Sequence, residues 1–336
     1  ISTSLRSLYS LDSIWQELGL QSAARSTIAY ANENRPWDIY ESLFYALLEE
    51  CQSLFPGQQK FSFKNDLQIL DATTIDLCLN LFPWAEFRTR KGAIKIHAQL
   101  NQRSQIPDII DITDGKTHEV TIAKDMDFST YTKGTIFVMD RGYNDYSLLW
   151  NIKQAGHHFV IRRKKDANIV HLGQHRKVKP GCGVMNDERV SLALEDAQES
   201  YPLDLRLITY LDQDTMQIYE YFTDDFRLSA SNIALIYQKR WDIEIFFKWI
   251  KQNLKIKTFF GTSRNAVLTQ IWIAMIYFLL VKWIKQQISY KGTMKELTCM
   301  ISTLLCQRVQ FVQVAKLTPP YLGRLRIRAG PQPSLF

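Results

Sequence analysis

The order in which strand-like and helix-like segments follow one another most limits what this chain can fold into. Alternating or continuously apolar segments predict three successive strands at 67–77, 92–101 and 107–115. A short helix at 120–126 and a buried apolar run ending at Asp140 come next. Residues 144–156 then have helical spacing and a glycine stop, and 157–163 form a fifth predicted strand.

This element order is that of a ribonuclease-H-like α/β fold with a mixed five-stranded sheet and helices. In that fold the first and fourth strands lie side by side at the centre of the sheet. Asp71 is on the first predicted strand and Asp140 ends the fourth, so we expect the two acids to be neighbours. A single Asp at a strand end commonly caps a turn. Two buried acids brought together need a partner charge, which favours a functional site.

Composition and the alternation of strands and helices divide the rest of the chain into regions. Residues 166–222 break the alternation of strands and helices and resemble a small β insertion, because they contain Pro180, Gly181 and Gly183 followed by short alternating segments. The predicted organisation is a helical N-terminal region at 1–60, the first part of the core at 61–165, the insertion at 166–222, the remaining core helix with C-terminal helices at 223–315, and a basic tail at 316–336.

Composition narrows the class of protein. Lys and Arg total 41 against 34 Asp and Glu, giving a net charge of +7, which favours a polyanionic partner. The five cysteines show no C-x-x-C spacing, so we expect neither a disulfide framework nor a zinc ribbon, and a reducing cytoplasm fits. The apolar run 271–281 is too short to span a bilayer and predicts a buried helix. Ile1 in place of Met suggests a fragment, a non-standard start codon or an interrupted reading frame, and a missing natural N-terminus is one expectation.

The segment 237–251 combines charges with large apolar side chains. On one continuous helix, Tyr237, Arg240, Glu244 and Lys251 would fall at roughly 0°, 300°, 340° and 320°, forming one polar stripe. The neighbouring core-facing band would be Ile236, Ile243, Phe247 and Ile250. The stripe is either a solvated face with intrahelical ion pairs or a metal ligand flanked by phosphate-binding groups.

Three acids in the order Asp71, Asp140 and Glu244, on two strands and one helix, can converge on two Mg²⁺ ions about 3.5 to 4 Å apart. Hard oxygen ligands suit Mg²⁺, and Mn²⁺ can substitute. With these acids in place, the sequence resembles the DDE transposases of bacterial insertion sequences, in the IS-four family. The resemblance rests on DATTIDL, on FVMDRGY and on the signature Y-x2-R-x3-E-x6-K, and it extends from about residue 20 to 290.

The resemblance implies an activity, partners and a location. It implies metal-dependent cleavage at the ends of an insertion sequence, followed by strand transfer into target DNA. The implied partner is double-stranded DNA, both the element's terminal repeats and the target, bound by a homodimer or a higher synaptic complex. We therefore expect a cytoplasmic, DNA-associated bacterial enzyme that does not use a membrane.

The resemblance also implies roles for residues around the acids. Arg240 and Lys251 are expected to hold phosphates on either side of the scissile bond. Tyr237 is expected to bond to the DNA backbone or to stack on a displaced base. Arg141 and Tyr143, which follow Asp140, are predicted either to contact DNA or to pack at the surface.

The sequence departs from the family in two respects. Some relatives use a tryptophan of the insertion to hold a flipped base, but residues 166–222 contain none, so either Tyr219 or Tyr221 serves or excision avoids a hairpin. The region 1–60 is shorter than the family's usual DNA-recognition part, which predicts weak terminal-repeat binding. Two alternatives stay open: a truncated, catalytically idle DNA-binding inhibitor of transposition, and a structure-selective ribonuclease-H-like nuclease.

Overall fold

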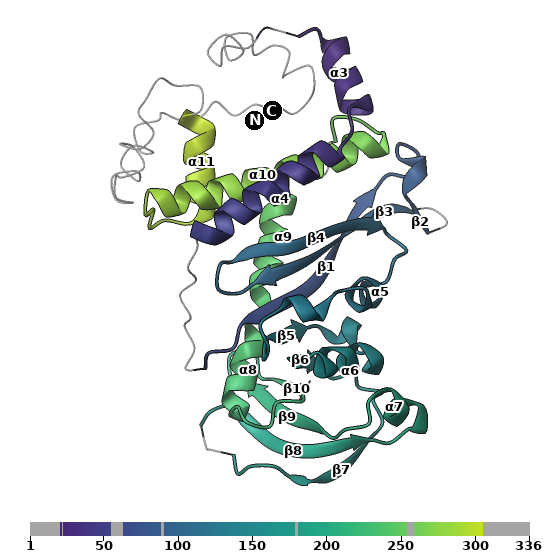
Figure 1. The fold of residues 1–336 in the computed structure, drawn as a ribbon, viewed down its shortest axis with the longest axis vertical. Coiled ribbons are helices and arrows are strands. Elements are labelled where there is room, and N and C mark those ends of the chain that lie inside the picture. Colours follow the sequence, from purple (N-terminus) through teal and green to yellow (C-terminus); the bar gives the residue numbers. More distant parts are fainter. Residues whose placement is uncertain are drawn as a thin grey trace. The chain divides into compact units, whose positions relative to one another are not determined.

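The structure is a computed structural model, and it divides the chain into two compact units (Figure 1). It describes residues 21, 23–54, 63–88, 91–178, 181–253 and 259–304. The sheet unit comprises Pro56–Lys248, and the helical unit comprises Ile1–Phe55 with Trp249–Phe336. Residues 1–20 of the predicted helical N-terminal region and the tail predicted at 316–336 lie outside the described residues.

Ten strands of the described residues form one mixed sheet in the sheet unit (Figure 1). They are β1 (Leu67–Leu77), β2 (Glu86–Arg88), β3 (Lys91–Asn101), β4 (Ile106–Asp114), β5 (Ile136–Met139), β6 (His158–Arg162), β7 (Ile169–Gln174), β8 (Val184–Leu192), β9 (Leu205–Asp212) and β10 (Gln217–Thr223). The pairs β4–β3 and β3–β1 are antiparallel, whereas β1–β5 and β5–β6 are parallel. The order β4-β3-β1-β5-β6 confirms the predicted ribonuclease-H-like fold.

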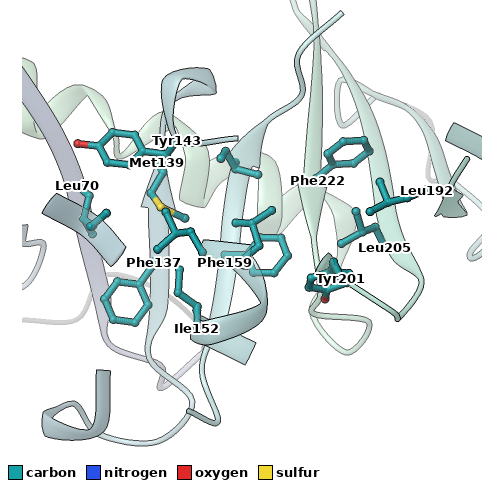
Figure 2. Packing of buried hydrophobic residues seen from close by; sticks show 14 of the residues in the cluster. Leu70, Phe137, Met139, Tyr143, Ile152, Phe159, Leu192, Tyr201, Leu205 and Phe222 are labelled. Atoms are coloured by element: carbon teal, nitrogen blue, oxygen red, sulfur yellow. The ribbon is translucent and has the colours of Figure 1, made fainter. Parts of the chain in front are cut away.

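One face of these strands makes the main hydrophobic core. Leu70, Phe137, Met139 and Phe159 come from β1, β5 and β6 and meet Ile152 of α6 (Tyr146–Gln154) (Figure 2). Each of these side chains, once buried, stabilises the fold by roughly 1.5 to 3 kcal/mol. Because side chains alternate along a strand, a residue that directly follows a core residue points to the opposite face of the sheet.

The helices of the sheet unit begin and end where local chemistry permits. The side chain of Asp145 accepts a hydrogen bond from the Leu148 N–H at 3.0 Å and caps α6. Gly156 follows that helix with φ +85°, a conformation that favours glycine. The other helical segments are η1 (Pro83–Ala85), α5 (Glu119–Lys124), η2 (Phe128–Thr130), η3 (Arg141–Tyr143), α7 (Glu195–Ser200) and α8 (Ala230–Gln238), and α9 (Trp241–Asn253) begins in this unit.

The strands of the segment 166–222 continue the central sheet. β10 pairs antiparallel with β6, placing Phe222 beside Ile161, and β9, β8 and β7 follow in order to the sheet edge. Arg206 of β9 is fully buried and donates to both carboxylate oxygens of Asp187 on β8 at 2.8 Å. The segment is therefore joined to the core by the backbone pairing of β10 with β6, and the buried ion pair joins β8 to β9 within the segment.

The helical unit contains α3 (Arg25–Asn34), α4 (Asp38–Leu54), α10 (Arg264–Gln287) and α11 (Met294–Leu304). Both α3 and α4 lie in the N-terminal region predicted to be helical, and α4 packs along α10 with the rings of Phe44 and Trp272 5.3 Å apart. The run 271–281 is a buried helix as predicted. However, α10 has 24 residues and, among the described residues, is a helix long and apolar enough to cross a membrane. Most of its apolar window is buried inside the protein, which is typical of a core helix.

Candidate functional site

Asp71 and Asp140 lie on the same face of two neighbouring parallel strands. β1 pairs with β5 as far as Leu70 and Met139, and the two acids follow these residues directly. Leu70 and Met139 belong to the buried core, so the acids point to the opposite face. Asp71 is in the middle of β1, at the point where β5 ends, and both acids are half-buried. Asp71 and Asp140, which were predicted to be neighbours, thus lie together at the centre of the sheet.

The turn after β5 holds Asp140 in position. Its Oδ1 accepts a hydrogen bond from the backbone N–H of Gly142 at 2.7 Å and caps η3. A Cβ at position 142 would lie 2.9 Å from the same oxygen, closer than real Cβ contacts allow. Glycine is therefore required at this position for the carboxylate to keep its orientation.

The single helix predicted for 237–251 is wrong, because the chain turns between α8 and α9. The backbone N–H groups of Lys239 and Arg240 donate at 3.0 Å to the carbonyls three residues earlier, those of Ile236 and Tyr237. This is the tighter 3-10 pattern, and it ends α8 before α9 starts. Tyr237 is consequently on α8 and Glu244 on α9, with Arg240 in the turn between them. The predicted core band is confirmed as buried: Ile236, Ile243, Phe247 and Ile250.

Arg240 connects two of the three acids. Its Nη1 donates to Asp71 Oδ2 at 3.1 Å, and its Nη2 donates to Glu244 Oε1. The side chains of Arg240 and Asp71 are each 17% exposed, and that of Glu244 is 34% exposed. The other oxygen of Asp71 accepts the Ala72 N–H at 2.8 Å. One guanidinium therefore joins β1 to α9.

The pKa of Asp71 shows that the acids influence one another. Burial raises this pKa to about 7; Arg240 opposes the rise, and Asp140 and Glu244 add to it. Burial likewise raises the pKa of Tyr237 to about 12, with Arg240 lowering it and Asp140 raising it. Nearby charges shift a pKa mainly over short distances. The three acids, Arg240 and Tyr237 therefore share one electrostatic neighbourhood.

The donor set suits a metal, but the present arrangement holds an arginine. Carboxylate oxygens are the ligands that Mg²⁺ and Mn²⁺ prefer. Within the described residues, no three His, Cys, Asp or Glu side chains come close enough together to hold an ion. Arg240 instead lies between Asp71 and Glu244. Carboxylate ligands suit the predicted metal. In this arrangement two of the three carboxylates pair with the Arg240 guanidinium.

The predicted DNA-contacting residues have different surroundings. Arg141 is exposed beside Asp140. Tyr143 is only 3% exposed and belongs to the hydrophobic core on the other face of the sheet, so its placement does not support the predicted contact with DNA (Figure 2). Tyr237 is 9% exposed. Lys251 is in the last turn of α9, within the helical unit, and its phosphate contact stays a prediction.

Arg162 lies next to the site, although the sequence did not single it out. It ends β6, whose Ile161 pairs with Met139, so Arg162 is beside Asp140 across the parallel strands. Its Cζ lies 4.8 Å from the ring centre of Tyr219. Arg162 follows a buried apolar run just as Asp140 does. The same strand-end argument applied to the fifth strand would have identified it.

An aromatic row leads from the acids into the extended sheet. The rings of Tyr237 and Tyr221 are 4.5 Å apart, and those of Tyr221 and Tyr219 stack at 6.3 Å with 5° between their planes. Tyr221 is 2% exposed, whereas Tyr219 is half-buried. Of the two tyrosines considered in place of a tryptophan, Tyr219 has the more accessible ring.

Known proteins similar to this chain are transposases. The family described as transposase DDE domain matches residues 62–280. The chain is 29% identical over 320 residues to a putative transposase, y4zB, of Sinorhizobium fredii, covering 94% of this chain and 86% of that protein. It is 26% identical over 270 residues to a probable transposase for insertion sequence element IS5377 of Geobacillus stearothermophilus, covering 80% and 69%.

Among solved structures, the chain matches a cryo-EM structure of the piggyBac transposase synaptic complex with hairpin DNA. The match has a TM-score of 0.43 and 10% identity over 85% of this chain and 61% of that chain, which is too weak to bear on fold or function. The family match covers more than half of the chain and includes all three acids. This protein therefore belongs to the transposase DDE-domain family, among the transposases of insertion sequences.

Proposed function

We propose that this chain cuts DNA at the ends of an insertion sequence and joins those ends to target DNA at one site containing Asp71, Asp140 and Glu244. Asp71 supports the proposal most strongly. It lies in the middle of a central strand, where no turn needs a cap, and burial together with both other acids raises its pKa. Functional sites are where such perturbed, mutually interacting acids are commonly found.

Asp71, Asp140 and Glu244 would hold Mg²⁺, or Mn²⁺ in its place. When bound, such a metal pair supplies activation of a water or a DNA 3′-OH as nucleophile and stabilisation of the leaving oxygen at phosphorus. Asp71 would hold the metal together with both other acids, because its strand pairs with the strand that precedes Asp140 and one arginine joins it to Glu244. Its raised pKa means that ligation would release a proton.

Basic side chains around the acids would position the DNA. Arg162 ends the strand that neighbours β5, beside the position of Asp140, and Arg141 follows Asp140 in the next turn. Cationic groups of this kind neutralise phosphates and fix the register of a duplex. Tyr237, Arg240 and Lys251 complete the proposed contact set. We further propose a homodimer or higher synaptic complex acting on paired ends in the bacterial cytoplasm.

The test is cleavage of a duplex that carries the native element's ends, with Mg²⁺, by the full chain and by Glu244→Gln. We expect the substitution to reduce cleavage by about a thousandfold, equivalent to about 4 kcal/mol, with duplex binding unchanged. Glu195→Gln is the matched control, because Glu195 is exposed on α7 and touches none of the site residues. It should cleave like the parent.

The same assay separates the alternatives. Cleavage followed by covalent joining to a target duplex supports transposition. Cleavage without joining would point to a structure-selective nuclease, and binding without metal-dependent cleavage would point to an idle inhibitor. Full activity in Glu244→Gln would remove Glu244 from the mechanism.

A further inference from the structure

Arg240 makes ion pairs with carboxylates on two separate elements. Asp71 on β1 and Glu244 on α9 each give one oxygen to the same guanidinium. The second oxygen of Asp71 accepts a hydrogen bond from the Ala72 N–H, and Asp140 accepts one from the Gly142 N–H. Each oxygen of Asp71 thus accepts a hydrogen bond from the protein in this arrangement.

The guanidinium itself is incompletely bonded. Its Nε is buried and has no hydrogen-bond partner among the residues that the structure describes. A buried donor without a partner costs roughly 1 to 3 kcal/mol. Arg240 also comes from the turn between α8 and α9 and not from the interior of either helix. Two ion pairs and the Tyr237 ring, whose centre lies 5.9 Å from the Arg240 Cζ, hold the arginine, while its Nε has no partner among the described residues.

We propose that Arg240 is a displaceable internal counter-ion of the acid site. Its guanidinium stays on Asp71 and Glu244 until a divalent cation takes those oxygens, and it then becomes available to a DNA phosphate. The inference rests on the proposed function, since it assumes that the acids bind a metal. It adds that the same arginine competes with the metal for its ligands.

The physical reason is that the two states exclude each other. The guanidinium fork matches a carboxylate and a phosphate equally well, so Arg240 can exchange one for the other. A divalent cation on Asp71 and Glu244 would repel a guanidinium held at the same oxygens. Linkage then requires that metal binding and phosphate binding by Arg240 favour each other. The acids also never remain buried without a compensating positive charge.

The experiment is equilibrium binding of Mn²⁺ to the full chain without DNA, followed by electron paramagnetic resonance. Arg240→Gln should bind Mn²⁺ about tenfold more tightly than the parent, because no internal cation has to leave. Arg162→Gln is the matched control, since Arg162 is a neighbouring cation with no ion pair to these acids among those the structure describes. Its Mn²⁺ affinity should stay within about twofold.

The outcomes separate this inference from the function on which it rests. If Asp71→Asn abolishes Mn²⁺ binding and Arg240→Gln binds no more tightly than the parent, the competition is refuted and the metal site stands. An equal gain in Arg162→Gln would also refute it, because loss of any nearby charge would then suffice. If Asp71→Asn binds Mn²⁺ normally, the metal site and the inference both fail. If Arg240→Gln does not fold, Arg240→Lys replaces it in the test. Lysine lacks the guanidinium fork, so an Mn²⁺ affinity above that of the parent supports competition. An Mn²⁺ affinity equal to that of the parent refutes it.

Discussion

Two arginine–carboxylate clusters in the sheet unit use the same chemistry in different ways. Arg206 is fully buried, and its Nε and Nη2 donate hydrogen bonds to the Asp187 carboxylate. Its Nη1 donates to the backbone carbonyls of Asp225 and Leu228. Arg240 is half-buried, pairs with acids on two elements and leaves Nε without a partner among the described residues. Complete bonding fixes the first arginine in place, and incomplete bonding leaves the second able to exchange partners.

Asp71 also differs from Asp224, a buried acid outside the candidate site, in how completely it is bonded. Asp224, which follows β10, is buried, yet hydrogen bonds from His158 and Lys153 lower its pKa. Burial raises the pKa of Asp71 to about 7, and the ion pair with Arg240 does not reverse the shift. The contrast shows that burial alone does not set the character of an acid. The number of donors committed to it decides between a structural anchor and a reactive group.

Removing Arg206 should have the largest effect on stability. Arg206→Met leaves Asp187 buried without a partner, which typically costs about 3 to 5 kcal/mol. Urea unfolding measures the loss. Arg189→Met is the control, because Arg189 is 53% exposed and its pair with Asp204 is 3.5 Å long, so a change below about 0.5 kcal/mol is expected. A loss below about 1 kcal/mol in Arg206→Met would mean that this cluster is no anchor.

The pH dependence of stability should show opposite signs for the two acids. The folded state holds the Asp71 proton more tightly than the unfolded state, so its contribution is full below about pH 4 and is lost as pH rises to about 7. Asp71→Asn should remove a decline of about 4 kcal/mol in the metal-free protein, because the rise of this pKa from about 4 to about 7 corresponds to about 1.4 kcal/mol for each pH unit. Asp224, with its lowered pKa, loses its contribution as pH falls below about 4. Parallel unfolding profiles for Asp71→Asn and the parent would contradict the assignment.

Removing Arg240 should cost little in the metal-free protein. Arg240→Met is expected to reduce the free energy of unfolding by about 1 kcal/mol, because Asp71 can take up a proton when its partner is lost. Thermal and urea unfolding at neutral pH measure the change. A loss as large as that in Arg206→Met would show that both arginines are anchors and would remove the contrast between them.

Arg162→Gln should have the smallest effect and should act on DNA binding alone. Arg162 stacks on Tyr219 beside Asp140, where a phosphate contact would contribute one released counterion. Measured against salt concentration, the logarithmic slope of duplex affinity should fall by about one, with stability unchanged. An unchanged slope would place Arg162 outside the DNA path.

Local periodicity was sufficient to predict the core fold. The apolar runs before Asp71 and Asp140 identify β1 and β5, and their order places the acids together. The turn at Lys239 and Arg240 was not predictable, because it contains neither Gly nor Pro and only the backbone bonds reveal it. The pairing of β10 with β6 was equally hidden, since contacts between distant strands leave no periodic signal.

At the site, residue identities were more predictable than partners. The signature gave Arg240 and Glu244 a shared face, and the structure does bring them together through an ion pair. It also assigned Arg240 to phosphate, because spacing along one segment cannot show that Asp71 from a distant strand would reach it. Tyr143 was predicted either to contact DNA or to pack at the surface because it follows an acid, whereas the structure places it in the buried core.

The most direct test of the shared acid site is a crystal structure of the full chain with Mn²⁺, located by anomalous scattering. We predict manganese peaks bounded by the carboxylates of Asp71, Asp140 and Glu244, with the Arg240 guanidinium withdrawn from Asp71. Manganese bound elsewhere, or no peak at these acids while Arg240 still joins Asp71 to Glu244 at saturating metal, would contradict the account.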